Sequence, residues 1–368
     1  MNAPWMEKYR WMRFPLAVFA MSRVAIVLLS HWGLRIDPRL HRGAAILDHP
    51  GVDSLCWWDC GWFVRIAQLG YQDPLWSNFF PLFPLLGRWL HQLTGMPLPY
   101  ALVLWANLFG AAGLVVTYRL FEALEGESVA RTGVALLAAW PFSFFHATGY
   151  PESLMFLTSV TAIYLALRGR HLWAGVVLGV GILGRHLTVV AGLSLLVMQL
   201  LERGRKPLRF VFHPAFLGLV LPFVVAGTYS VFLAYRFGDP LAFLHARSEG
   251  WGEGAWYGLG QYFSDTSRWE PQIHAYVVLS AIPGVGALAL LSRRQWWGLA
   301  GFGVGLMIAL WCIGLLGLGR YTQACWPAFL PMAYLLEKYP DFRTPVITAF
   351  AMLQGLFLFL FTHSYPIN

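Results

Sequence analysis

The sequence predicts an all-α polytopic integral membrane protein, and three observations support this fold class. Its 368 residues are 58% hydrophobic and only 12% charged, whereas soluble domains are about 25% charged and roughly half apolar. Long apolar runs alternate with short polar loops along the chain. The 18 tryptophans and 15 tyrosines are residue types that are enriched at the membrane–water interface. Because a backbone in lipid must satisfy its own hydrogen bonds, we expect the membrane spans to be helices.

The predicted spans are the apolar runs that approach the length of about 20 residues a helix needs to cross a membrane. They lie at 14–32, 98–118, 132–149, 151–167, 210–233, 272–291, 296–317, 321–337 and 344–362. The segment 172–201 differs, because Gly-Arg-His at 184–186 divides it into two short apolar halves. We expect two short helices that meet at Arg185, which gives about eleven spans in one domain over 1–368. No small-x-small cleavage site follows the first run, so we expect that run to be retained as a span.

The charges of the loops predict the orientation of these spans. With the N-terminus in the cytoplasm, most Lys and Arg residues fall in the short inner loops, as the positive-inside rule requires. The two long loops, 33–97 and 234–271, then lie outside, and long loops are more often functional than idle. We therefore expect any site to be extracytoplasmic. The basic residues flank the apolar runs instead of forming one stripe, so the net charge of +8 does not indicate a nucleic-acid partner.

Asp59 is a single carboxylate among the tryptophans of the first outer loop, in the sequence WWDCGWFVRIAQLG at 57–70. The apolar residues after it recur at helical spacing and predict an amphipathic helix in the membrane interface, which Gly70 ends. Asp59 either caps this helix, which would contribute about 1 kcal/mol, or acts as a chemical base. Cys56 and Cys60 lie beside it without the further His or Cys residues of a zinc pattern. We interpret both cysteines as small packing residues and predict no metal site.

A second polar turn lies between two predicted spans, in the sequence HATGYPESL at 146–154. Glu152 follows Pro151 at the start of a helix, where free N–H groups and the helix dipole stabilise a carboxylate. This local role explains Glu152 without any ligand. His146 and Tyr150 nevertheless make the turn unusually polar for a connection between spans, so the turn is also a candidate binding element.

Two arginines lie where a charge is costly. Arg185 and His186 separate two apolar halves, and a charge at membrane depth costs about 2.5 kcal/mol or more. Such an arginine faces a cavity or a partner, so Arg185 either pairs with Asp59 or Glu152 or binds a lipid phosphate through its planar fork. Arg320, at the start of a later span, is either an interfacial anchor or a second phosphate ligand.

Five motifs in fixed order resemble the PIG-V family, which comprises GPI mannosyltransferase II and its prokaryotic relatives. The motifs are WWDCGWFVRIAQLGY, FFPLFPLL, GYPESL, RFGDPLAFLHA and GRYTQACWPAFL. The resemblance covers most of the chain. It departs at Cys60, where a small residue such as Ala is expected, and at His186, where a smaller polar residue or Pro is expected.

The resemblance implies a membrane glycosyltransferase of the GT-C class, with a GT-C-like helical bundle. Such an enzyme moves a sugar, by resemblance mannose, from a polyprenyl phosphate to a hydroxyl of a glycan or glycolipid, on the outer face of a membrane. The resemblance places the catalytic carboxylate at Asp59, which would take the proton of the attacking hydroxyl in an inverting displacement. Cationic groups would stabilise the phosphate leaving group, and Arg185, Arg320 and His186 are the candidates. The candidates for binding the sugar or the acceptor are Glu152, His146, Tyr150, Trp58 and Trp62.

The main alternative is a transporter or flippase of a lipid-linked sugar. A transporter needs polar groups at several membrane depths, whereas the inner halves of these spans are almost bare of them. A non-catalytic scaffold would leave the outer carboxylates without a role. The chain contains no Asp-x-Asp pair, which disfavours a metal-bound nucleotide sugar as donor, and we expect no cofactor besides the lipid donor. Arg outnumbers Lys, which favours a prokaryotic plasma membrane.

Overall fold

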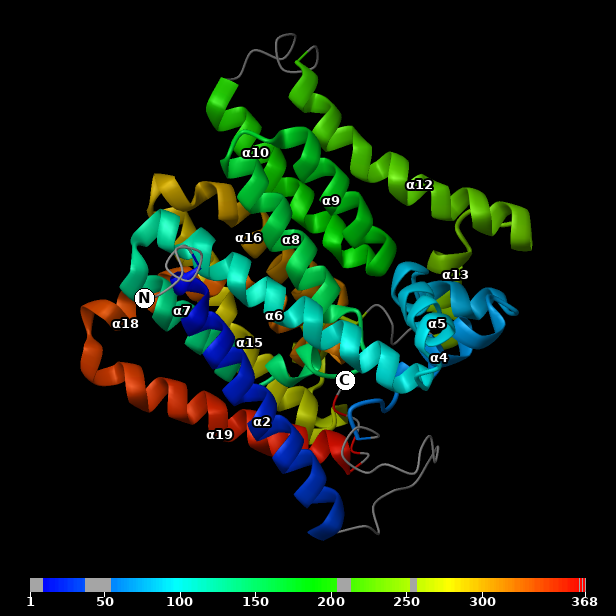
Figure 1. Ribbon diagram of the computed structural model, residues 1–368, viewed down its shortest axis with the longest axis horizontal. Coiled ribbons are helices and arrows are strands. Elements are labelled where there is room, and N and C mark those ends of the chain that lie inside the picture. The colour runs from blue at the N-terminus through cyan, green and yellow to red at the C-terminus, as the bar shows by residue number, and fades with distance from the viewer. Residues whose placement is uncertain are drawn as a thin grey trace, which may run out of the picture.

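The computed structural model describes residues 9–36, 54–203, 213–251, 257–363, 365 and 367, and its regular structure over these residues is entirely helical (Figure 1). The α-helices are α2 (Arg13–Ile36), α4 (Cys60–Leu69), α5 (Leu82–Thr94), α6 (Leu98–Glu125), α7 (Glu127–Ala139), α8 (Glu152–Leu167), α9 (His171–Gly184), α10 (Gly192–Arg203), α12 (Leu217–Phe237), α13 (Ala242–Trp251), α14 (Leu259–Ser264), α15 (Pro271–Ala289), α16 (Trp297–Ile313), α17 (Leu318–Thr322), α18 (Phe329–Lys338) and α19 (Arg343–Thr362). Short 3-10 helices join them: η1 (Arg10–Met12), η3 (Pro74–Asn78), η4 (Ser143–His146), η5 (His186–Ala191), η6 (Pro214–Phe216), η8 (Thr266–Arg268), η9 (Leu290–Ser292), η10 (Arg294–Trp296), η11 (Leu315–Gly317), η12 (Trp326–Ala328) and η13 (Pro340–Phe342). The predicted all-α class is confirmed.

Six helical segments in the described ranges are long and apolar enough to cross a membrane. They are Arg10–Gly33, Leu98–Glu125, Leu217–Phe237, Pro271–Ser292, Arg294–Ile313 and Pro340–Thr362. Three shorter apolar helices accompany them, at Glu152–Leu167, His171–Gly184 and His186–Glu202. The protein is therefore an integral membrane protein, as predicted, but the predicted count of about eleven spans is not confirmed.

Prolines explain why two predicted spans, 132–149 and 321–337, are wrong as continuous helices. α7 ends at Ala139, and Trp140 takes an extended ψ of 136° immediately before Pro141. A residue that precedes proline is driven out of the helical region by the proline ring. The second span is divided into α17, η12 and α18, and Pro327 in the first turn of η12 has no N–H with which to continue the hydrogen bonds of a helix. Both interruptions lie in buried, apolar sequence, where the apolar pattern alone predicts a continuous helix.

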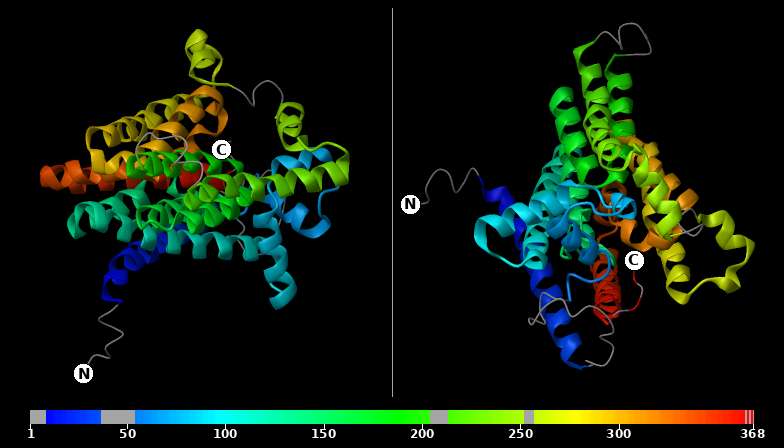
Figure 2. Two further views of the ribbon diagram at one scale, coloured as in Figure 1. Left: turned by 90° about the horizontal axis from the view of Figure 1, so that it is seen from above. Right: turned by 90° about the vertical axis from the view of Figure 1, so that its right-hand side faces the viewer.

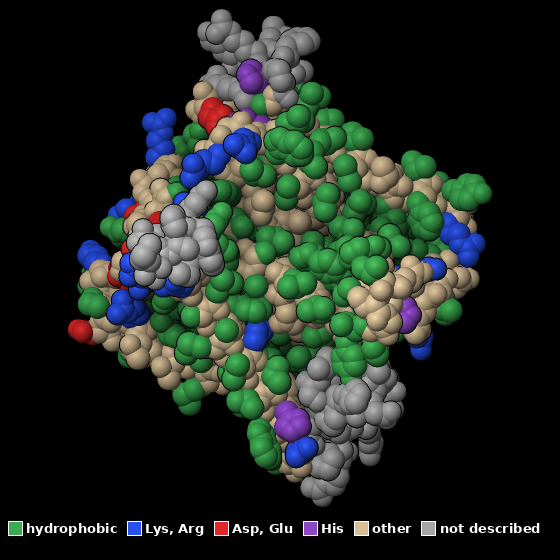
Figure 3. All heavy atoms as spheres, in the orientation of Figure 1, with side chains coloured by type: hydrophobic (Ala, Val, Ile, Leu, Met, Phe, Trp, Pro, Cys, Tyr) green, Lys and Arg blue, Asp and Glu red, His purple; other side chains and the backbone are tan. Residues whose placement is uncertain are grey.

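The surface fits this membrane placement. In the orientation of Figure 1, hydrophobic side chains cover the middle of the molecule, and Lys, Arg, Asp and Glu side chains gather along the left edge near α7 and α18 (Figure 3). An exposed apolar band of this extent is expected where lipid replaces water around the helices.

Small residues allow the central helices to approach closely. α8 packs against α6 and α9, and α9 packs against α12; the green helices α9 and α12 lie side by side in Figure 2. A Cβ atom on Gly175 of α9 would lie 2.3 Å from the backbone oxygen of Gly218 in α12. Only glycine permits this contact between backbones, a device common between helices in lipid.

The predicted break at Arg185 is confirmed. α9 ends at Gly184, Arg185 is extended with φ −156° and ψ 122°, and η5 begins at His186. The Arg185 amide still donates to the carbonyl of Gly181 at 2.9 Å, and its carbonyl accepts from Thr188 at 3.0 Å. The break therefore turns the chain without leaving these backbone groups unpaired, and it delivers Arg185 to the end of α9.

The two long loops meet beside the end of α12. α4, η3 and α5 form a lobe on one side of the bundle, next to α13 (Figure 1), and α13 packs directly on η3. Tyr229 of α12 donates to the carbonyl of Ser77 at 2.8 Å, and Arg236 donates to the carbonyl of Tyr71 at 3.0 Å. Residues 37–53 of the first predicted loop and 252–256 of the second lie outside the described residues.

Candidate active site

One cavity of about 170 Å³ gathers four of the residues predicted from the sequence. Asp59 at the start of α4, Arg185 and His186 at the α9–η5 break, and Arg320 of α17 all line it. The remaining lining residues are Phe63, Asn78, Phe79, Phe80, Gly184, Arg247, Gly314, Leu316, Gly317 and Tyr321. Four segments that are distant in sequence therefore meet at one polar hollow, and the break in α9 contributes two of its side chains.

Asp59 stands at the N-cap position of α4 but its side chain does not cap the helix. Its backbone carbonyl accepts from Trp62 at 3.0 Å, while its carboxylate Oδ2 accepts from Arg320 Nη1 at 2.6 Å. The Asp59 side chain is 25% exposed and that of Arg320 only 7%. Of the two roles considered for Asp59, side-chain capping is therefore wrong, and the carboxylate is held at the edge of the cavity by an arginine.

Glu152 lies behind the cavity and compensates two arginines at once. Its side chain is 1% exposed, and Oε1 is 3.3 Å from Arg185 Nη1 and 3.4 Å from Arg320 Nε. Arg185 thus pairs with Glu152, one of the partners considered for it. Both guanidinium groups also donate to the hydroxyl of Tyr321, Arg185 at 2.6 Å and Arg320 at 2.9 Å. The result is a buried network in which each arginine is fixed by more than one neighbour.

The residues predicted to bind sugar or acceptor do not line this cavity. The ring of Trp62 stacks on Phe79 at 5.7 Å, and that of His146 stacks on Phe156 at 4.9 Å. Trp58 is 42% exposed. The predicted sugar contacts of all five candidates stay predictions, and the structure gives Glu152 a different contact, with the arginines.

Tyr150 is buried directly behind Asp59. Its hydroxyl accepts from the Asp59 amide at 3.1 Å and donates to the carbonyl of Trp57 at 2.9 Å. Because it ties two backbone groups of the same turn to the start of α8, Tyr150 orients the turn that carries the carboxylate.

The cavity contains three polar residues that the sequence reasoning missed: Asn78, Arg247 and Tyr321. Arg247 belongs to α13 in the second long loop, and its Nη2 donates to the carbonyl of Ile313 at 3.3 Å. Phe243 precedes Arg247 by one helical turn and lies on the same side of α13, and both residues line a second hollow beside the cavity. That spacing of an aromatic residue and an arginine in a long loop was the available signal for Arg247. Tyr321 follows Arg320 directly in the GRYT sequence.

An apolar groove continues from the polar cavity. A second hollow of about 170 Å³ shares with it five lining residues: Asn78, His186, Arg247, Gly314 and Tyr321. The rest of its wall is apolar, formed by Leu187, Phe243, Leu244, Ala309, Leu310 and Ile313. A ligand that occupies both hollows would therefore have a charged head and a hydrocarbon tail. Within the described ranges, no three His, Cys, Asp or Glu side chains converge as a metal-binding group.

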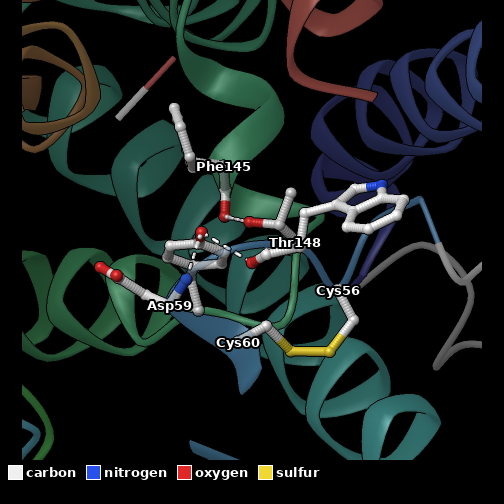
Figure 4. Close-up of a disulfide and its surroundings, with 7 residues drawn as sticks. Cys56, Asp59, Cys60, Phe145 and Thr148 are labelled. Atoms are coloured by element: carbon white, nitrogen blue, oxygen red, sulfur yellow. Dashed lines mark hydrogen bonds between the residues drawn. A yellow bond between two sulfur atoms is a disulfide. The ribbon is translucent and has the colours of Figure 1, made fainter. Parts of the chain in front are cut away.

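Cys56 and Cys60 are joined by a disulfide, which corrects their interpretation as small packing residues. Their Cα atoms are 5.1 Å apart, within the range a disulfide requires. Figure 4 shows the bond beneath the turn, with the side chain of Asp59 pointing away from the sulfur atoms.

No sequence-family profile matches the chain, and no curated protein matches its sequence. Solved structures do match it. The oligosaccharyltransferase AglB of Archaeoglobus fulgidus, in complex with an inhibitory peptide and a dolichol-phosphate, has a TM-score of 0.56 at 13% identity, over 99% of this chain and 56% of that one. The Archaeoglobus fulgidus oligosaccharyltransferase tethered with an acceptor peptide containing the NVT sequon gives 0.55 at 14% identity, over 100% and 56%. The complex of that enzyme with Zn and sulfate gives 0.52 at 14% identity, over 96% and 53%.

These matches establish the fold. The chain spans little more than half the length of the oligosaccharyltransferase structures, and nearly all of this chain takes part in the superposition. The helical bundle is thus the GT-C fold, as the sequence resemblance implied.

Proposed function

We propose that the protein is a membrane glycosyltransferase that moves a sugar from a polyprenyl-phosphate donor to an acceptor hydroxyl, with Asp59 as the general base. The observation that carries the proposal is the continuity of the two hollows: a carboxylate and three arginines line the polar one, and aliphatic and aromatic side chains line the other. A lipid phosphate bearing a sugar matches this division, because its charged group and its hydrocarbon chain require opposite surroundings.

The proposed reaction is a single displacement at the anomeric carbon. The acceptor oxygen forms a bond to that carbon, its proton passes to the Asp59 carboxylate, and the bond from the carbon to the phosphate oxygen breaks with its electron pair leaving on the phosphate. Transfer of the proton in the transition state typically contributes 10²–10⁴-fold. Attack from the face opposite the leaving group inverts the anomeric centre, as the sequence resemblance implies.

The arginines and Tyr321 stabilise the leaving group in this proposal. The Tyr321 hydroxyl accepts from Arg185 and from Arg320, so its own hydrogen is directed to a third position and can be donated to a phosphate oxygen in the cavity. Donors fixed before the reaction cost little reorganisation when charge develops. Arg247 and His186, which line both hollows, are placed for the phosphate at the junction of head and tail.

The lipid class of the donor and the side of the membrane are supported by separate observations. The apolar groove is bounded by Phe243, Leu187 and residues of α16, which suits the first isoprene units. The match to AglB in complex with a dolichol-phosphate supports the same lipid class. The Cys56–Cys60 disulfide supports an extracytoplasmic site, because disulfides persist in oxidising compartments. Mannose as the sugar and a prokaryotic plasma membrane follow from the sequence resemblance and composition.

The test is sugar transfer by purified protein in lipid nanodiscs. The donor is polyprenyl-phosphate mannose, the acceptors are a panel of soluble and lipid-linked glycans, and Asp59→Asn is compared with the wild type. We expect transfer by the wild type and a loss of about 10²–10⁴-fold in kcat for the variant. Equal transfer by both proteins would exclude Asp59 as the base. If the wild type transfers nothing from this donor or from polyprenyl phosphates that carry other sugars, the enzymatic proposal fails, and movement of a lipid-linked sugar across proteoliposomes is then the measurement to make.

A further inference from the structure

The Cys56–Cys60 disulfide brackets the turn that carries Asp59. Both cysteines are fully buried. The bond between them (Figure 4) closes a loop, and the residues within that loop are Trp57, Trp58 and Asp59. A bond of this kind across so short a loop restricts little of the unfolded chain, since the entropic effect of a disulfide grows with loop length. Its effect on the local geometry of the turn is therefore the larger one.

The other side of this turn is fastened to residues before α8. The Gly149 amide donates to the carbonyl of Leu55 at 2.9 Å, and Tyr150 holds the backbone of Trp57 and Asp59. A Cβ atom on Gly149 would lie 2.4 Å from Cys60 Sγ. The sulfur thus fills all the space that the absence of a side chain at Gly149 leaves open.

The backbone between the cysteines adopts a conformation that its residue disfavours. Trp58 has φ +51°, and among the described residues it is the one non-glycine residue with positive φ. For a bulky residue this region is sparsely populated and costs on the order of 1–3 kcal/mol. The turn keeps this conformation because the disulfide on one side and Tyr150 on the other determine it.

We propose that the Cys56–Cys60 disulfide is a positioning element for sugar transfer: it fixes the turn that presents Asp59 to Arg320 and the cavity, so the protein is fully active only when the bond is formed. This inference rests on the proposed role of Asp59. A reductant such as dithiothreitol supplies two electrons and two protons, converts the S–S bond into two thiols and becomes a cyclic disulfide. Two unbonded sulfurs need more room than two bonded ones, and Gly149 provides none, so reduction moves the Asp59 turn.

The kinetic test compares oxidised wild type, wild type reduced with dithiothreitol, and the double variant Cys56→Ala/Cys60→Ala. We expect reduction to lower kcat about 10- to 100-fold, as a misplacement of about 1 Å can do, with the KM for the donor within about twofold because the arginines keep their places. The double variant should show the same lowered kcat and no response to dithiothreitol, and reoxidation should restore only the wild type. Cys312→Ala, which removes an exposed free cysteine, is the matched control and should respond like the wild type.

A purely structural disulfide would give a different pattern. Reduction would then lower the melting temperature while kcat, measured well below that temperature, stayed unchanged, and this result would overturn the proposal. Alkylation of the thiols followed by mass spectrometry shows whether reduction was complete. If the buried bond resists dithiothreitol, the kcat of the double variant decides between the two roles. If the double variant fails to fold, the kcat of the reduced wild type decides.

Amide hydrogen exchange tests the inference without any activity. Reduction should accelerate exchange in peptides covering 55–62, where the Asp59 amide is hydrogen-bonded to Tyr150, and should leave α6 unchanged. If oxidised wild type transfers no sugar, the proposed function fails, but faster exchange in this turn would still support positioning by the disulfide. Equal exchange in both forms would overturn the positioning role even if sugar transfer is observed.

Discussion

Replacing Glu152 by Gln removes the buried charge that Arg185 and Arg320 share while keeping the shape of the side chain. Each Coulomb contact, at 3.3 Å to Arg185 and 3.4 Å to Arg320, is worth about 5 kcal/mol at an effective dielectric constant near 20. The neutral amide also avoids the desolvation cost of several kcal/mol that a buried carboxylate carries, and this offsets part of the lost attraction. Because neither Glu152 oxygen has a hydrogen bond of good geometry, we take the low end of the 3–5 kcal/mol typical of breaking a buried pair. Glu152→Gln should therefore lower the free energy of unfolding by about 3 kcal/mol.

The assay is reversible unfolding in mixed detergent micelles, combined with the KM for the donor. Since Glu152 holds both arginines in place, we expect the KM to rise about tenfold, equivalent to about 1.4 kcal/mol of binding, with a smaller change in kcat. The matched control is Glu127→Gln, which breaks an exposed pair between Glu127 and Arg131 and should cost about 0.3–0.5 kcal/mol. If Glu152→Gln costs no more than this control, the buried carboxylate is not what balances the arginines, and the reasoning is wrong.

Three other substitutions test the remaining contacts. Arg247→Ala should raise the KM for the donor about tenfold, equivalent to about 1.4 kcal/mol. The control Arg268→Ala, which removes a cation stacked on Tyr257 and Trp269, should leave this KM unchanged. Equal effects of the two substitutions would show that Arg247 does not bind the donor phosphate. Tyr321→Phe keeps the ring but removes the acceptor of two guanidinium hydrogen bonds, so it should cost about 1–3 kcal/mol of stability and weaken donor binding, and an unaltered protein would contradict the network. Gly149→Ala should cost about 1–3 kcal/mol by overpacking, while Gly61→Ala, where a Cβ meets nothing within 4 Å, should be tolerated; similar stability of the two would show that the turn has room to yield.

Local signals in the sequence predicted individual charged residues of the site but not which of them pair with one another. Asp59, Arg185 and Arg320 were predictable because an isolated charge in apolar sequence needs a partner or a cavity. Asp59 and Arg320 are 261 residues apart, so nothing local shows that they touch. For the same reason, the sequence left Asp59 and Glu152 as alternative partners of Arg185. Only the packing of α8 against α9 assigns Arg185 to Glu152.

The disulfide and the helix count escaped prediction for different reasons. A spacing of four residues between Cys56 and Cys60 suits two helical packing residues as well as a bond, and in the turn that the bond closes Trp58 has a positive φ. That conformation is rare for tryptophan and has no signature in the sequence. The predicted count of about eleven spans, which is not confirmed, came from apolar composition alone, whereas Pro141 and Pro327 interrupt two of the apolar runs. The segment between α7 and α8, which follows the interruption at Pro141, contains Tyr150 and so supports the turn that carries Asp59.

In the proposed reaction, the charges that line the cavity stay balanced from the bound donor to the products. Arg185, Arg247 and Arg320 face Asp59 in the cavity and Glu152 behind it, so the arginines exceed the carboxylates by one. A sugar–phosphate–lipid diester carries one negative charge and is balanced by this excess. As the sugar leaves, the phosphate develops a second negative charge, approaching about −2 at neutral pH, while Asp59 is neutralised by the acceptor proton. The two changes offset each other, so the net charge of the cavity and its ligand stays constant through the step. No uncompensated charge is buried as the phosphate leaves, and the step therefore avoids the desolvation cost of several kcal/mol that an unpaired buried charge would add to the barrier.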